Sequence, residues 1–219
     1  MAHSPRKPVK RAIGDHMKSL ITLLALVPAL VLAYDLDSKA LHNEDIPFLG
    51  HHADKPFGSY LTLEVHYAPV KKLLSQLESD VGLLKNRGEA HITVITPVEF
   101  DRVLKPAGVT IQEINEIALE AKIQASKFTP VCVGAGSATI DGKLEKTYFM
   151  VVKSPELLAI RKKVADLYDS KDADPARFDP DHFYPHITLG YTWDDLHEQP
   201  HDVFKGIRAC LQNGQIDIR

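Results

Sequence analysis

Two short stretches, Ala90-His91-Ile92-Thr93-Val94 and Pro185-His186-Ile187-Thr188-Leu189, repeat the same order of side chains. Each places His, Ile, Thr and a further apolar residue in succession. In a β-strand, residues i and i+2 point to the same face, so each stretch puts an imidazole beside a hydroxyl and turns the isoleucine toward a core. We therefore predict two strands that meet at a cleft containing two His and two Thr.

The repetition of this motif is more informative than either copy alone. With eleven His in 219 residues, a single His-x-Thr match has little specificity. Either His91 or His186, taken alone, could be an ordinary half-buried strand residue. Two copies that share the same intervening isoleucine are not expected by chance, and they indicate a common role.

The doubled motif resembles the 2H phosphoesterase superfamily, which includes 2′,5′ RNA ligase-like proteins and cyclic phosphodiesterases. The stretch FYPHITL at residues 183–189 is similar to the second motif of that family. Residues 88–97, GEAHITVITP, are similar to the first motif of its RNA-repair-like branch. The resemblance covers residues 60 to about 193. Many members carry a basic residue shortly after the second motif, whereas Gly190-Tyr191 follows here.

The resemblance implies an α+β fold that is bilobal and pseudo-twofold, with two antiparallel sheets facing a central cleft and helices outside. It implies a metal-independent phosphoesterase that hydrolyses 2′,3′-cyclic phosphates on RNA ends or small cyclic nucleotides, without a cofactor.

The side chains themselves suit that chemistry. Imidazoles titrate near neutral pH, so His91 and His186 can serve as a general acid–base pair, although the sequence does not say which is which. The hydroxyls of Thr93 and Thr188 can bind the phosphate and stabilise its developing charge. Tyr191 and Tyr184 flank the second motif and could stack on a base, or could be core or rim aromatics.

Three other classes of function remain open. The first is a catalytically silent nucleotide-binding module with the same cleft. The second is a metal-dependent hydrolase that uses His182 and His186, whose spacing suits a helix; Pro185 disfavours a helix there. The third is a secreted interaction protein. The cluster His51-His52 with Asp54 could bind a metal or belong to a solvated loop.

Residues 1–33 are expected to be an N-terminal extension followed by a signal peptide. Five basic residues precede an uncharged apolar run of 14 residues, 20–33, which is shorter than the roughly 20 residues of a membrane span. Val31-Leu32-Ala33 suits cleavage before Tyr34. Met17-Lys18 would be a natural start, so residues 1–16 could be an extension. A signal anchor or a core helix are the alternatives, and Pro28 disfavours the helix. We expect a secreted chain without stable membrane association after cleavage.

Charge limits the partners. Without residues 1–33 the chain keeps 21 basic and 28 acidic residues, a net charge of −7. Long nucleic acids are bound largely through Lys and Arg, so a net acidic chain is not expected to bind them. We expect a small cyclic nucleotide or an RNA 3′ end as the partner. We also expect the protein to be a monomer. Export would permit a disulfide between Cys132 and Cys210, but two buried thiols fit the sequence equally well.

The remaining pattern predicts an irregular lead-in at 34–58 and a single domain at 59–219. Apolar spacing and turn residues place the elements of that domain. The expected elements are strands at 60–67, 90–96 and 129–133, helices at 69–85, 111–125 and 155–168, a bend at 134–136, a hairpin turn at Asp141-Gly142, and one or two short helices within 193–211.

Overall fold

The computed structural model describes Met1 and residues 33–219. The predicted extension and signal peptide fall on residues 2–32, which lie outside the described residues. Among the described residues, no helix has the length and apolar character needed to cross a membrane.

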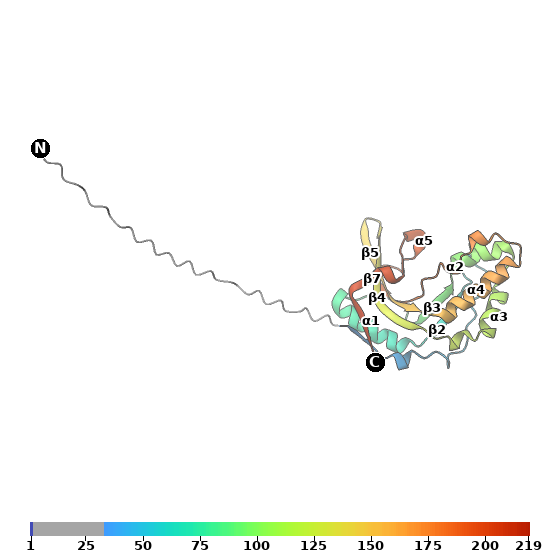
Figure 1. Ribbon diagram of the computed structural model, residues 1–219, viewed down its shortest axis with the longest axis horizontal. Coiled ribbons are helices and arrows are strands. Elements are labelled where there is room, and N and C mark those ends of the chain that lie inside the picture. The colour runs from blue at the N-terminus through green and yellow to red at the C-terminus, as the bar shows by residue number, and fades with distance from the viewer. Residues whose placement is uncertain (2–32) are drawn as a thin grey trace. The chain divides into compact units, whose positions relative to one another are not determined.

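Figure 1 shows strands and helices interleaved along the chain. The strands are β1 (Tyr34–Leu36), β2 (Leu61–Val65), β3 (Ala90–Ile95), β4 (Thr129–Ile140), β5 (Lys143–Lys153), β6 (His186–Tyr191) and β7 (Cys210–Ile218). The α-helices are α1 (Tyr67–Val81), α2 (Pro97–Glu99), α3 (Ile111–Glu120), α4 (Pro155–Asp169) and α5 (Glu198–His201). Shorter turns are the 3₁₀ segments η1 (Ser38–Leu41), η3 (Lys105–Ala107), η4 (Ile123–Ala125), η5 (Pro175–Arg177) and η6 (Ile207–Ala209), and a π-helical segment, η2 (Phe100–Leu104).

The strands form two separate sheets. Five strands pair in the order β1-β7-β4-β5-β6, and β2 pairs with β3 in the second sheet. All pairs are antiparallel except β1 with β7, which run parallel. The α+β class is confirmed. The pseudo-twofold arrangement of two antiparallel sheets is not confirmed, because the sheets differ in size and one contains a parallel pair.

Strands β1 and β7 account for much of this asymmetry, and the sequence did not predict either of them. The stretch at 210–218, CLQNGQIDI, is largely polar, and of its residues only Gly214 is buried. A Cβ on Gly214 would lie 2.2 Å from the Val133 carbonyl oxygen, so glycine permits this close approach of backbones. The strand therefore depends on its neighbours in the sheet, which single-residue preferences do not reveal.

The hairpin between β4 and β5 is confirmed. Asp141 and Gly142 both have positive φ, 49° and 78°, as tight hairpin turns of this kind require. Strand β4 continues through the expected bend, and its register against β7 shifts between Cys132 and Gly134. The glycines here permit close packing: a Cβ on Gly134 would lie 2.7 Å from the Phe149 ring.

The helices bury their apolar faces as the sequence predicts. Helix α1 lies against β1 and β6, whereas α3 and α4 lie side by side and α4 contacts β3 (Figure 1). Helix α1 is shorter than expected because Gly82, with φ 86°, ends it. Helix α4 begins as predicted, with the Ser154 side chain accepting from the Leu157 amide and Pro155 in its first turn.

The two cysteines form a disulfide. Cys132 on β4 and Cys210 at the start of β7 are joined, with Cα atoms 5.8 Å apart. The bond closes a loop of 78 residues and fixes the polar strand β7 to the centre of the larger sheet. The structure thereby contains a disulfide, whereas the sequence was equally consistent with two buried free thiols.

Replacing both cysteines with serine is expected to lower the free energy of unfolding by about 4 kcal/mol, because a loop of this length strongly restricts the unfolded chain. Urea denaturation of the oxidised protein and the Cys132→Ser/Cys210→Ser variant measures this difference. A loss below about 1 kcal/mol would contradict the expectation.

Candidate active site

The strands that carry the two motifs belong to different sheets and lie next to each other. Strand β3 pairs with β2, and β6 is the edge strand of the larger sheet. Just before β3, Lys85 exchanges two backbone hydrogen bonds of 2.9 Å with Tyr191 at the end of β6. This bridge links the two sheets and brings together motifs that are far apart in the sequence.

All four predicted motif residues line one cavity of about 580 Å³: His91, Thr93, His186 and Thr188. Aromatic and charged side chains share the same lining. They include Phe57, Tyr60, Arg87, Glu99, Arg161, Phe183, Tyr184, Asp195, Glu198, Phe204 and Lys205. The cavity thus contains both titratable imidazoles and both hydroxyls, together with three basic side chains (Arg87, Arg161 and Lys205) and three acidic ones (Glu99, Asp195 and Glu198).

His186 is held in one tautomer. Its Nδ1 lies 2.8 Å from the carbonyl oxygen of Tyr184. A carbonyl only accepts, so Nδ1 carries the proton and Nε2 keeps a lone pair. Burial, and then the neighbouring Lys205, lower the pKa of His186 to about 3. At neutral pH the ring is therefore uncharged, and the lone pair of Nε2 is available to accept a hydrogen bond.

His91 has a different electrostatic environment. Burial lowers its pKa, but Glu64 and Glu89 oppose that shift. Glu64 is the cross-strand partner of His91 on β2, and Glu89 Oε1 lies 3.7 Å from His91 Nδ1. Glu64 and Glu89 therefore favour a charged His91 and Arg87 disfavours it, whereas Lys205 disfavours a charged His186 and Asp195 favours it. Burial is the largest cause at both rings, and it lowers the pKa of each.

Most of the residues that line this cavity fall within a part of the chain that matches a known family. Residues 59–197 match the family model described as Swiss Army Knife, 2H phosphoesterase domain. The chain belongs to the 2H phosphoesterase family. No curated protein and no solved structure matches it. A phosphoesterase activity of the general 2H type follows from this membership.

The 2H phosphoesterase site contains a buried ionic cluster that the sequence analysis did not identify. Asp195 accepts hydrogen bonds from Lys205 at 2.6 Å, Thr147 at 2.9 Å and Thr188 at 3.0 Å. Burial opposes ionisation of Asp195, but Lys205 and His197 hold its pKa well below the usual range. Lys205 is itself only 5% exposed.

This cluster supplies cations that the motif lacks. No basic residue follows the second motif at Gly190-Tyr191, but Arg87, within the matched domain, and Lys205, beyond its end at residue 197, bring positive charge to the cavity. Arg87 stands four residues before His91, and this closeness to the first motif is the sequence feature that could have identified it as a site residue. Nothing in the spacing of Asp195 or Lys205 marks them as site residues, because they meet only in the folded chain.

The two threonines of the 2H motifs differ in their contacts. Thr188 donates its hydroxyl proton to Asp195. Within the described part of the chain, no hydrogen bond engages the Thr93 hydroxyl. Thr93 is therefore ready to donate to a phosphoryl oxygen, whereas Thr188 must first turn from Asp195. Asp195 would keep Thr147 and Lys205 as partners after such a change.

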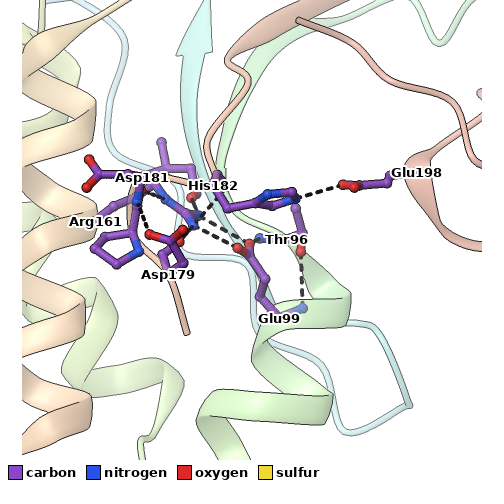
Figure 2. A network of polar contacts seen from close by, with 9 residues as sticks. Thr96, Glu99, Arg161, Asp179, Asp181, His182 and Glu198 are labelled. Atoms are coloured by element: carbon purple, nitrogen blue, oxygen red, sulfur yellow. Dashed lines mark hydrogen bonds and ion pairs between the residues drawn. The ribbon is translucent and has the colours of Figure 1, made fainter. Parts of the chain in front are cut away.

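Arg161 of α4 supports one side of the cavity. Its guanidinium is nearly fully buried and pairs with Glu99 at 2.8 Å. It also donates to the carbonyl of Val94 on β3 and to the carbonyls of Pro180 and His182. Figure 2 shows Arg161 between Glu99 and the loop that leads to the second motif. One side chain thus connects the end of the first motif strand to the segment before the second.

The structure places the two tyrosines considered for stacking in different surroundings. Tyr191 is 9% exposed and does not line the cavity, because its strand turns that ring into the protein core. Tyr184 lines the cavity, is 37% exposed and packs edge-to-face against Phe204. Of these two tyrosines, Tyr184 is the one that lines the cavity.

The histidines considered as metal ligands do not gather around a common point. His51 hydrogen bonds to Glu64 at 3.3 Å and stacks on Tyr60, while His52 lies 3.7 Å from Asp54. His182 precedes β6 in a loop, and its Nε2 lies 3.0 Å from Glu198 (Figure 2). His182 and His186 are therefore four residues apart in the sequence but do not lie on a helix.

Proposed function

We propose that this 2H phosphoesterase hydrolyses 2′,3′-cyclic phosphates on RNA 3′ ends or small cyclic nucleotides. The observation that carries the proposal is the single cavity shared by His91, Thr93, His186 and Thr188. An acid, a base and donors to phosphate are the groups that this hydrolysis requires, and these four side chains can supply all of them.

The electrostatics support His186 as the base and His91 as the acid. In this scheme the neutral Nε2 of His186 removes a proton from a water molecule, whose oxygen attacks phosphorus. The bond from phosphorus to one ribose oxygen breaks, and protonated His91 donates a proton to that oxygen. The product is a ribose phosphomonoester with a free neighbouring hydroxyl. Thr93 and the cations of the cavity stabilise the charge on the phosphoryl oxygens.

The size of the cavity and the aromatic side chain of Tyr184 support this substrate class. About 580 Å³ accommodates a nucleotide, and Tyr184 at its edge offers a surface for the base. The net negative charge of the chain makes long nucleic acids unsuitable as partners.

A panel of 2′,3′-cyclic nucleotides and of oligonucleotides with a cyclic 3′ end tests the proposal, with a chelator present in every assay. Turnover by the wild-type protein supports it. Binding of 2′-AMP without turnover of any cyclic substrate would instead support the silent nucleotide-binding module.

The assigned roles predict an acidic pH optimum for kcat/KM. His186 must be neutral, so activity rises as pH increases through its pKa of about 3. His91 must be protonated, and burial lowers its pKa below the ordinary value of about 6.5, so activity falls as pH increases through that pKa. We expect kcat/KM to fall about tenfold per pH unit between pH 7 and 8. A rate that rises over this interval would refute the assignment.

We also propose that the protein acts as a monomer in an oxidising compartment. The disulfide between Cys132 and Cys210 supports this location. Strand β1 begins at Tyr34, so cleavage after Ala33 would leave the described fold whole. Recovery of protein with Tyr34 as its first residue from the medium of expressing cells would support export.

A further inference from the structure

A second group of chemically active side chains lies outside the cavity. His42 Nδ1 lies 3.0 Å from Asp45 Oδ1, and His66 Nε2 lies 2.8 Å from the same oxygen. The two imidazole rings are 4.7 Å apart between centroids. One possible ligand atom from each residue falls within 4.8 Å of the others. His42 and Asp45 come from the lead-in, and His66 joins β2 to α1.

The backbone that carries this group is fixed by two buried amides. Asn43 stands between His42 and Asp45 in the sequence, and its side chain donates to the carbonyl of Gln124. Gln124 in turn donates to the Asn43 carbonyl at 3.2 Å and accepts from the Glu64 amide at 3.0 Å. Both amide side chains are less than 9% exposed. Gln124 therefore holds the His42–Asp45 turn and the end of β2, which carries His66, at a set separation.

The donor set is characteristic of zinc. Two imidazole nitrogens and one carboxylate oxygen bind Zn²⁺ at about 2.0–2.2 Å, and water commonly takes a fourth position. Hard cations such as Ca²⁺ and Mg²⁺ prefer oxygen ligands throughout, so two imidazoles disfavour them.

We propose that His42, Asp45 and His66 form a Zn²⁺ site, through His42 Nδ1, one Asp45 oxygen and His66 Nε2. None of the three lines the cavity. The ion takes the place of the shared hydrogen bonds to Asp45 and binds the lead-in to the junction of β2 and α1. With three protein ligands and a position left for water, the site is independent of the proposed hydrolysis.

Isothermal titration calorimetry of the full chain with ZnCl₂, after removal of bound metal by a chelator, tests the proposal. We expect one Zn²⁺ per chain and a higher melting temperature in its presence. Loss of groups that merely surround a metal typically weakens binding 10- to 100-fold, so losing a ligand in His42→Ala or His66→Ala should weaken it at least about tenfold.

Two further variants make the result specific. Asp45→Asn keeps the shape of the side chain and removes its charge, and it should also weaken Zn²⁺ binding by at least about tenfold. His52→Ala removes another exposed lead-in histidine and should bind Zn²⁺ like the wild type. Circular dichroism confirms that each variant is folded. Absence of Zn²⁺ binding, or equal affinity in His42→Ala and the wild type, would overturn the proposal.

Discussion

Replacement of His186 with alanine is expected to lower kcat/KM on a 2′,3′-cyclic nucleotide about 100- to 10,000-fold. The neutral Nε2 is the base in the proposed reaction, and alanine leaves water without a proton acceptor. Among the described residues, the His186 ring makes one side-chain hydrogen bond, from Nδ1 to the Tyr184 carbonyl, and one edge-to-face contact with Phe149, so we expect the variant to fold. Steady-state kinetics and circular dichroism of the purified variant test both statements.

The matched control is His52→Ala, which removes an exposed imidazole from the lead-in and should keep the wild-type rate. If His186→Ala is folded and turns over the cyclic substrate at the parental rate, the assignment of the base is wrong.

His91→Ala allows the acid to be distinguished from the base. On the cyclic substrate it should lose activity over the same range as His186→Ala. On a phosphodiester with a p-nitrophenyl leaving group, which departs as a stable anion without needing a proton, His91→Ala should recover much of its activity. His186→Ala should stay inactive on both substrates. The reverse pattern would exchange the two roles.

Replacement of Asp195 with asparagine is expected to lower the free energy of unfolding by about 3–5 kcal/mol. Lys205 is almost completely buried, and its ammonium lies 2.6 Å from Asp195 Oδ1. Asparagine leaves this buried charge without a counter-ion, and such an uncompensated charge is strongly destabilising. Thermal or urea denaturation measures the loss.

Asp194→Asn is the control, because Asp194 is the exposed neighbour of Asp195 and asparagine can still accept its hydrogen bond from the Asp195 amide. We expect Asp194→Asn to change stability by less than about 0.5 kcal/mol. The double variant Asp195→Asn/Lys205→Met should lose less than the sum of the two single variants, since the buried charges act as a pair. Additive losses would show that the pair is not coupled.

The sequence correctly predicted the elements whose pattern is local. Strand β3, the β4–β5 hairpin and the start of α4 have alternation, a turn dipeptide or a capping residue within a few positions of each other. Strands β1 and β7 could not be predicted in this way. Strand β7 is mostly polar, and its place is fixed by sheet pairing and by Cys210.

The candidate site likewise has a part that the sequence predicted and a part that it did not. The pairing of His91 with Thr93 and of His186 with Thr188 follows from the two-residue period of a strand, so the sequence by itself determined these four side chains and the family to which the chain belongs. Only the tertiary structure decided that both pairs share one cavity, that Asp195 and Lys205 form a buried ion pair there, and that Tyr191 faces the core. The physical reason is that these relations join residues far apart in the chain, and their distances, burial and pKa shifts exist only after the sheets have packed.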